Sequence, residues 1–409
     1  MKQNRKFPKV FITKKGEASV LRGHPWVYEG EVVQIDGEFQ DGEIVDVFSP
    51  KEKYLGSGFI NSHSKIRIRL ISRNANDLFD DAFWRRRIEY AWSYRKTVMG
   101  DDLSCCRIIF GEADQFPGLT VDRFQDILVV QVLSLGIEKI KYRLFPLLVQ
   151  VLQEDGEEIR GIYERNDVKI RLLEGMQEEK GWYPLAGMDT PEETVTRIFE
   201  NGISYLVDFE NGQKTGFFLD QKYNRWEVAK ICKGKKVLDC FTHTGSFALN
   251  AAYGGAQEVT AVDISKTALE TADINIDENN LSHIVHTLQM DIFDLLKELE
   301  EKHDHSYDVI ILDPPAFTKS RDTVTSAMRG YKEINYRAMK LLPRGGYLVT
   351  CSCSHFATDE LFRKMLQEAA IDAGVNLREV LERKQAPDHP ILWNVKETEY
   401  LKFYIFQVV

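Results

Sequence analysis

The stretch VLDCFTHTGSFALNAAYGGAQEVTAVDIS, residues 237–265, decides the fold of this chain. It opens with a short apolar run that ends in Asp239, passes through a polar turn containing Gly245, and then changes to helical spacing. A second apolar run follows and ends in Asp263. A strand, a helix and a second strand within about thirty residues predict a βαβ unit of a parallel sheet.

The same alternation continues through the C-terminal half of the chain, which predicts a doubly wound, Rossmann-like α/β domain. The expected strands are residues 235–241, 258–263, 285–291, 307–315, 345–354 and 400–409. The expected helices are residues 246–255, 265–280, 292–302 and 326–342. In an open sheet of this kind, ligands bind beyond the carboxyl ends of the strands.

Upstream of this domain the pattern changes twice. Short β-rich runs between Gly, Asn and Ser at residues 10–13, 42–49, 54–61 and 65–72 predict a small all-β barrel. Helical spacing at 77–100 and 137–155 brackets further β-rich runs and predicts a compact α+β unit, β-β-α-β-β. The strands expected there are residues 107–113, 119–124, 126–134, 161–167 and 168–173. We therefore expect three domains, at residues 1–75, 76–190 and 191–409.

Length and composition agree with this division. At about 150 residues per domain, 409 residues correspond to two or three domains. The apolar fraction of 43% and the charged fraction of 28% are those of a soluble globular protein. No apolar run is long enough to span a membrane. The six cysteines include no CxxC pair, so we expect reduced thiols in the cytoplasm and neither a metal site nor a disulfide framework.

The net charge of −10 argues against a nucleic-acid partner, but the charge is unevenly distributed. The first 74 residues carry 13 basic and 9 acidic side chains. Within them, Lys65, Arg67 and Arg69 recur at period two and would project from one face of a strand. That face is open to two interpretations, a solvated barrel surface or a stripe that binds nucleic-acid phosphates.

Four successive predicted strands end in Asp239, Asp263, Asp291 and Asp313, although Asp is disfavoured within strands. Asp263 lies where a carboxylate would accept the ribose hydroxyls of a nucleoside, and Asp291 lies where an adenine amine would be met. The first turn has a single glycine, Gly245, which suits a ligand without a pyrophosphate. This combination predicts S-adenosylmethionine as cofactor. The alternative is that these carboxylates only cap the helices that follow.

These motifs resemble those of class I S-adenosylmethionine-dependent methyltransferases. Residues 237–265 are similar to motifs I and II of that class, and DPPAFTKS (313–320) to motif IV. TCSCS (350–354) is similar to motif VI of RNA 5-methylcytosine enzymes. NGQKTGFFLDQKYNR (211–225) and KQAPDHP (384–390) narrow the resemblance to bacterial 23S rRNA (cytosine-5-)-methyltransferases with an N-terminal PUA domain.

The resemblance implies methylation of cytosine carbon 5 in ribosomal RNA through a covalent adduct between a cysteine and the base. A nucleophilic cysteine is needed because carbon 5 of cytosine is itself a poor nucleophile. Cys353 falls on the S-C-S pattern of motif VI and is the expected nucleophile, with Cys351 as a packing residue. Asp313 is expected to hold the base, while Asp313, a water or His355 could remove the carbon-5 proton. The chain has no motif IV cysteine, in which it departs from other RNA cytosine enzymes.

The resemblance and the strand-end pattern together indicate a cofactor site. Its expected members are Phe218, Asp220, Gln221, Asp239, Phe241, Thr244, Gly245, Asp263, Ile264, Asp291, Asp313 and Pro314. Lys65, Arg67, Arg69 and Lys214 are the expected RNA contacts. Arg225, near Lys214, would either meet RNA phosphate or orient the loop.

Two other functions stay open from the sequence. One is methylation of a different RNA atom, such as a guanine nitrogen, and Cys353 argues against it. The other is a catalytically silent RNA-binding factor for ribosome assembly, which would not need the full set of motif residues. The expected partner is ribosomal RNA, 23S by resemblance, without a membrane partner, and the oligomeric state is open between monomer and homodimer.

Overall fold

The computed structural model describes residues 6–318 and 320–409. By packing, the chain divides into two compact units, each built from several segments. The first unit runs up to Ile198 and adds Val207–Leu219 and Pro387–Thr398. The second unit contains Phe199–Leu206, Asp220–Ala386 and Glu399–Val409. The expected junctions near residues 75 and 190 stay predictions.

The first unit opens with a six-stranded sheet in the order β2-β6-β5-β4-β1-β3. Its elements are β1 (Lys9–Ile12), α1 (Lys14–Leu21), β2 (Trp26–Val27), β3 (Val32–Asp36), β4 (Ile44–Phe48), β5 (Tyr54–Ile60) and β6 (Ile68–Ser72). Inward-facing aliphatic side chains from these strands form one buried cluster. The helix α1 is an addition to the expected all-β pattern, and the Thr13 hydroxyl caps it by accepting from the Gly16 N–H at 3.1 Å.

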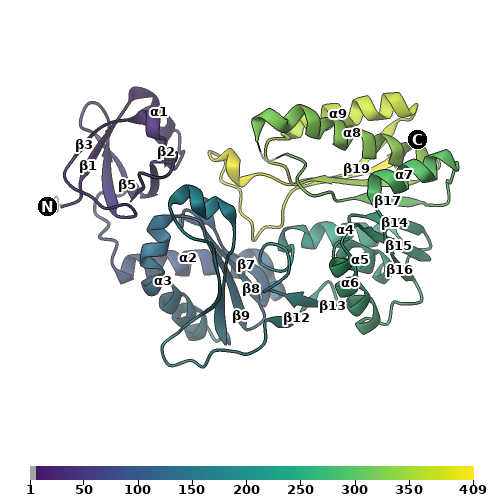
Figure 1. Ribbon diagram of the computed structural model, residues 1–409, viewed down its shortest axis with the longest axis horizontal. Coiled ribbons are helices and arrows are strands. Elements are labelled where there is room, and N and C mark those ends of the chain that lie inside the picture. Colours follow the sequence, from purple (N-terminus) through teal and green to yellow (C-terminus); the bar gives the residue numbers. More distant parts are fainter. Residues whose placement is uncertain (1–5, 319) are drawn as a thin grey trace. The chain divides into compact units, whose positions relative to one another are not determined.

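A five-stranded sheet follows, in the order β11-β10-β9-β8-β7. Its elements are α2 (Asp81–Met99), β7 (Cys105–Phe110), β8 (Leu119–Phe124), β9 (Ile127–Val132), α3 (Leu135–Glu154), β10 (Gly161–Asn166) and β11 (Glu179–Tyr183). Three strands precede α3, at the runs expected at residues 107–113, 119–124 and 126–134, although the description β-β-α-β-β counts one fewer. β9 and β10 are parallel because α3 crosses over between them, and α2 packs beside α3 (Figure 1).

The strand expected at residues 168–173 is wrong. Lys169–Glu174 form a short 3-10 helix, closed by Gly175 with a φ of +77°. The reason is Arg171, whose alternation with Leu172 and Ile170 imitates a strand. Its buried guanidinium donates to the carbonyl oxygens of Gln177 and Val132 at 2.8 and 2.6 Å, which requires a tight turn.

The second unit is built on a seven-stranded sheet in the order β16-β15-β14-β17-β18-β20-β19. Its strands are β14 (Lys236–Cys240), β15 (Glu258–Asp263), β16 (Val285–Gln289), β17 (Val309–Leu312), β18 (Tyr347–Ser352), β19 (Leu377–Arg383) and β20 (Lys402–Val408). The first five are mutually parallel, as expected, whereas β20 runs antiparallel to β18 and to β19. The order reverses between β14 and β17, which is the switch point where ligands bind.

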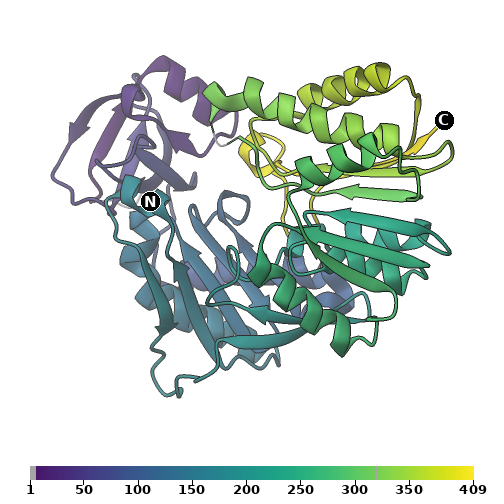
Figure 2. The same ribbon diagram turned by 45° about the vertical axis from the view of Figure 1, so that its right-hand side comes forward.

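Helices cover both faces of this sheet. Seen in Figures 1 and 2, α7, α8 and α9 lie on one face, and α4, α5 and α6 lie on the other. Their bounds are α4 (Lys222–Ile231), α5 (Ser246–Tyr253), α6 (Lys266–Glu278), α7 (Ile292–Glu301), α8 (Val324–Leu341) and α9 (Asp359–Ala373). Helices α7, α8 and α9 share one buried apolar cluster with the central strands. The doubly wound sheet is therefore confirmed.

Several elements were not expected from the sequence. They are α4, α9, β19 and the hairpin of β12 (Val195–Glu200) and β13 (Ile203–Asp208). β19 has mostly exposed side chains at the sheet edge, so it lacks the apolar pattern that identifies the central strands. Among the described residues, no helix combines the length and the apolar character of a membrane span.

Candidate active site

The carboxyl ends of the five parallel strands of the second unit meet at one edge of the sheet. Asp239 lies near the end of β14, Asp263 ends β15, Asp291 follows β16, Asp313 follows β17 and Cys353 follows β18. Parallel strands bring these residues to the same edge, although the first and the last of them, Asp239 and Cys353, are more than a hundred positions apart in sequence. The edge therefore contains the carboxylates and the thiol that the sequence indicated.

The turn after β14 has an unusual backbone. Phe241, His243 and Gly245 have φ angles of 66°, 52° and 83°. The first two are non-glycine residues in the left-handed region, which costs energy and persists only when surrounding contacts enforce it. One such contact is the His243 N–H, which donates to Asp263 at 2.9 Å. The half-buried Phe241 side chain has its ring centroid 6.5 Å from that of Phe317.

Asp239 is fully buried beneath this turn. Its Oδ2 accepts hydrogen bonds from the Thr242 hydroxyl at 2.5 Å and the Ala248 N–H at 2.9 Å. Its Oδ1 has no hydrogen-bond partner among the described residues, and the same holds for the buried Thr244 hydroxyl. Burial raises the pKa of Asp239 to about 7. A buried acceptor without a partner indicates a place where a ligand donor or cation is missing.

Asp263 and Asp291 have different surroundings. Both oxygens of the half-buried Asp263 accept backbone N–H groups, from His243 and from Ser265 at 2.9 Å each, so each oxygen retains a lone pair. Beside it, the Ile264 side chain is 65% exposed. Asp291 is the N-cap of α7 and accepts the Phe293 N–H at 2.8 Å. Capping thus explains Asp291, and its predicted contact with adenine stays a prediction.

Asp313 is held by a chain of oriented amides. The Gln221 amide nitrogen donates to Asp313 at 3.1 Å, and the Gln221 amide oxygen accepts from Asn224 at 2.6 Å. The Asn224 amide nitrogen also donates to the carbonyl oxygen of Lys384 at 3.2 Å. This chain fixes which end of Gln221 faces the carboxyl group. Burial, with the nearby charge of Asp220, raises the pKa of Asp313 to about 7.

The two cysteines of motif VI differ sharply in accessibility. Cys351 is fully buried in β18, and burial raises the pKa of its thiol well above the usual value. Cys353 is half-buried beyond the end of the strand, and its Sγ lies 4.0 Å from the carbonyl oxygen of Pro314. Cys353 is thus the motif VI thiol that a base can reach. His355 follows it, and its buried Nδ1 has no hydrogen-bond partner among the described residues.

The residues of the segment before motif I, 211–225, lie partly in the first unit and partly in the second. Asp220, in the second unit, accepts from the Tyr400 hydroxyl at 2.6 Å. Arg225 is 1% exposed and pairs with the buried Glu200 at 2.6 and 2.7 Å, which rules out contact with RNA phosphate. In the first unit, the Lys214 ammonium lies 4.8 Å from the ring centroid of the half-buried Phe218. The predicted roles of Lys214 in RNA binding and of Phe218 in cofactor binding stay predictions.

The stripe of Lys65, Arg67 and Arg69 is not one strand face. β6 begins only at Ile68, because the preceding turn is held by Glu174, which accepts from Ser64 at 2.6 Å. Arg67 and Arg69 are paired with acidic side chains, Arg67 with Glu29 at 2.8 Å and Arg69 with Glu112 and Glu174 at 3.3 and 2.8 Å. Of the three cations, only Lys65 is exposed. Their contact with RNA stays a prediction.

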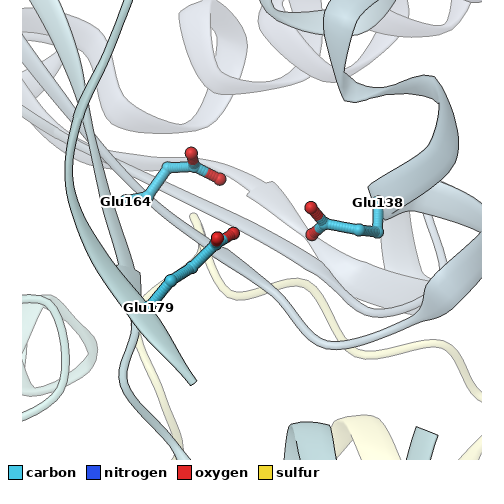
Figure 3. A group of neighbouring side chains, drawn as sticks. All are labelled: Glu138, Glu164 and Glu179. Atoms are coloured by element: carbon cyan, nitrogen blue, oxygen red, sulfur yellow. The ribbon is translucent and has the colours of Figure 1, made fainter. Parts of the chain in front are cut away.

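A cluster of three carboxylates lies in the first unit. Glu138, Glu164 and Glu179 point toward one another from α3, β10 and β11 (Figure 3). The Lys141 ammonium lies 2.7, 2.8 and 3.0 Å from their oxygens in turn. The lysine thus supplies the positive charge that this cluster requires, and the arrangement is a structural ion-pair network.

Comparison with known proteins places the whole chain. Residues 184–407 match the family model of S-adenosylmethionine-dependent methyltransferases, and residues 10–73 match that of a PUA-like domain. Ribosomal RNA large subunit methyltransferase I of Klebsiella pneumoniae is 36% identical over 405 residues, which cover 98% of this chain and 99% of the relative. The protein of that name from Cronobacter sakazakii is 38% identical over 403 residues, with the same coverage. This chain belongs to the ribosomal RNA large subunit methyltransferase I family.

Solved structures have a fold similar to that of this chain. A protein of Streptococcus mutans assigned to the SAM-dependent methyltransferases has a TM-score of 0.81 at 24% identity, covering 98% of this chain and 100% of its own. A methyltransferase structure complexed with SAH has a TM-score of 0.81 at 23% identity, with the same coverage. The predicted PUA-like start and Rossmann-like methyltransferase domain are confirmed.

The residues at the sheet edge fit S-adenosylmethionine, the cofactor of this family. The cofactor presents an ammonium group, a sulfonium group and two ribose hydroxyls, all of which seek acceptors or negative charge. Asp239 Oδ1 and Thr244 Oγ1 are buried atoms that have no hydrogen-bond partner among the described residues, and Asp263 retains lone pairs for the ribose. The acceptor atoms of the site therefore match the donor and cationic groups of the cofactor.

The affinity for S-adenosylmethionine is expected to fall as pH drops from 8 to 6. The cofactor has a net positive charge, whereas Asp239 becomes neutral below its raised pKa of about 7. At one pH unit below the pKa, only about a tenth of the protein carries the charge, so affinity falls about tenfold. Calorimetry at several pH values, in buffers of different ionisation enthalpy, should also show proton release near pH 7. An Asp239→Asn variant should bind weakly at every pH, and a pH-independent wild-type affinity would contradict the assignment.

Some residues of the site had no signal in the sequence. Asn224 orients Gln221 from α4, Tyr331 lies in α8, and Lys402 lies in the last strand. The Tyr331 hydroxyl is within 3.1 Å of Ser352 Oγ and 2.9 Å of Ser354 Oγ, the two neighbours of Cys353. Only the packing of the sheet and its helices brings these residues to motif VI.

Proposed function

We propose that this protein methylates carbon 5 of a cytosine in large-subunit ribosomal RNA, with S-adenosylmethionine as methyl donor. The observation that carries the proposal is the pairing of Cys353 with the Asp313–Pro314 turn. The accessible thiol lies 4.0 Å from the carbonyl oxygen of Pro314, and the residue before Pro314 is Asp313, whose carboxyl group has a raised pKa. A nucleophile and a proton donor at one site are what addition to cytosine requires.

The chemistry assigns one role to each group. The Cys353 thiolate adds to carbon 6 of the cytosine. Asp313 protonates the ring nitrogen N3, which takes up the electron pair that this addition displaces within the ring. Carbon 5 thereby becomes nucleophilic. Bound S-adenosylmethionine supplies an electrophilic methyl group at that carbon. Loss of the carbon-5 proton to a base then expels the thiolate, breaks the bond to carbon 6 and returns the N3 proton.

The pKa of Asp313 suits this role. Because burial raises it to about 7, a large fraction of the carboxyl groups is protonated at neutral pH. Proton transfer is most efficient when the pKa of the donor lies near the working pH. Gln221 donates to one oxygen of this carboxyl group, and the Cys351 thiol also hydrogen-bonds to the Asp313 side chain. The target base must leave its stack or be unpaired to reach this depth.

The alternative functions account for less of the site. Methylation of a guanine nitrogen requires no thiol, so it does not explain an accessible Cys353 beside Asp313. A silent assembly factor requires neither the strained turn after β14 nor the buried Asp239. We further propose that the partner is ribosomal RNA, 23S RNA in particular, and that the protein acts in the cytoplasm. The oligomeric state is open between monomer and homodimer, and the experiment below does not depend on it.

Mapping of large-subunit ribosomal RNA by mass spectrometry tests the proposal. RNA from a strain that lacks the gene should be missing one 5-methylcytosine that wild-type RNA contains. Re-expression of the wild-type protein should restore that methyl group, and re-expression of a Cys353→Ala variant should not. The proposal fails if methylation of every cytosine is the same with and without the gene. Loss of a methylated guanine instead would support the first alternative.

A further inference from the structure

Lys402 is the first residue of β20 and lies directly opposite motif VI. β18 and β20 are antiparallel, and Lys402 is the register partner of Ser352, the residue before Cys353. The Lys402 ammonium donates to the carbonyl oxygen of Ser354, the residue after Cys353, at 2.8 Å. The lysine side chain therefore spans the backbone on both sides of the nucleophile.

This lysine is buried without an anionic partner. Only 8% of Lys402 is exposed. Of its three N–H donors, one meets a hydrogen-bond acceptor among the described residues, and no described carboxylate lies within 4.0 Å of its nitrogen. Burial lowers the pKa of Lys402 to about 8. A buried ammonium is costly unless an anion compensates it.

Of the acidic groups that act on Lys402, Cys353 has the largest effect, followed by Asp359 and Glu399. Asp359 is already bonded to Arg363 and Tyr404, and Glu399 is paired with the exposed Lys384.

The titratable groups around the thiol point the same way. Tyr331, Cys351 and Lys402 are among the titratable groups that act on Cys353. Of these three groups, Lys402 carries a positive charge, whereas Tyr331 and Cys351 are neutral at pH 7.

We propose that the Lys402 ammonium is the counter-ion that stabilises the Cys353 thiolate in the resting enzyme. The thiol proton goes to solvent, and the lysine keeps its own proton throughout. Lys402 is a positioning residue, since it acts on the substrate only through Cys353. The inference rests on the proposed function, in which Cys353 is the nucleophile, and adds the means by which that nucleophile is kept ionised.

Alkylation of the folded protein by iodoacetamide tests this proposal. The five other cysteines are buried, so Cys353 is the cysteine that reacts in the native state. Mass spectrometry of the Cys353 peptide gives its rate between pH 5.5 and 9.5. In a Lys402→Met variant, the rate at pH 7 should fall about tenfold and the midpoint should rise by about one pH unit. A Lys402→Arg variant keeps the charge and should retain most of the wild-type profile.

Two controls keep the test specific. Lys384→Met removes an exposed charge from the same unit and should leave the profile unchanged. The midpoint temperature of thermal unfolding should not be lower for Lys402→Met than for the wild type, because methionine fills the same space without a buried charge. An unchanged alkylation midpoint in Lys402→Met overturns the proposal, even if methylation falls. Because alkylation requires neither RNA nor cofactor, its outcome is separate from that of the ribosomal RNA mapping.

Discussion

Cys353→Ala is expected to lower the rate of ribosomal RNA methylation by at least about a thousandfold, because the covalent route is lost with its nucleophile. Binding of S-adenosylmethionine should be unchanged, since the acceptors for the cofactor lie at the ends of β14 and β15 and in the turn after β14, not on motif VI. The assay is transfer of labelled methyl groups to large-subunit RNA from a strain that lacks the gene. Calorimetry of the same preparation checks that the cofactor site is intact.

Cys351→Ala is the matched control for this variant. It removes a thiol of the same motif, two residues away, from a fully buried position. Its rate should fall far less than that of Cys353→Ala, because the buried Cys351 thiol contacts Asp313 and Gln221 but does not reach the base. Its stability should fall by about 1 kcal/mol as a buried atom is lost. Substantial methylation by Cys353→Ala, or equal loss in both variants, would contradict the assignment of Cys353 as nucleophile.

Arg225→Met is expected to destabilise the protein by about 3–5 kcal/mol, because it leaves the Glu200 carboxylate buried and unpaired. Both oxygens of Glu200 are bonded to Arg225, at 2.6 and 2.7 Å, and both residues are almost fully buried. Denaturant unfolding followed by fluorescence measures the loss. The result would establish Arg225 as a structural residue of α4.

Two further variants make this prediction specific. Arg363→Met removes an arginine whose ion pairs lie at the surface, so its cost should stay below about 1 kcal/mol. The double variant Arg225→Met, Glu200→Leu removes both buried charges and should recover most of the stability lost in Arg225→Met. A cost for Arg225→Met no larger than that for Arg363→Met would contradict the prediction.

Parts of the active site follow from local sequence and parts do not. Asp239, Asp263 and Asp313 could be assigned to strand ends because apolar runs ending in a polar residue are visible in the sequence. Asp291 fitted the same pattern, yet its carboxylate is engaged as the N-cap of α7. Capping and ligand binding need the same residue type at the same place, so the pattern cannot separate them.

The RNA contacts predicted from period-two spacing depend on partners that spacing does not reveal. Period-two spacing placed Arg67 and Arg69 on one strand face, but the strand begins at Ile68 and both arginines are paired with acids. Partners such as Glu174 come from the 3-10 helix between β10 and β11, more than a hundred residues away. Sequence spacing contains no information on such partners.

The amino-acid sequence by itself determined the fold class and the cofactor, and it predicted Cys353 rather than Cys351 as the nucleophile. These depend on period-two and helical patterns and on short motifs, in which the informative residues are neighbours in the chain. Only the tertiary structure decided how these groups are tuned. The Gln221–Asn224 chain on Asp313, the burial of Asp239 and the position of Lys402 opposite motif VI all arise from pairing between distant segments. Burial and long-range contacts set the charge of an active site, and both are properties of the packed chain.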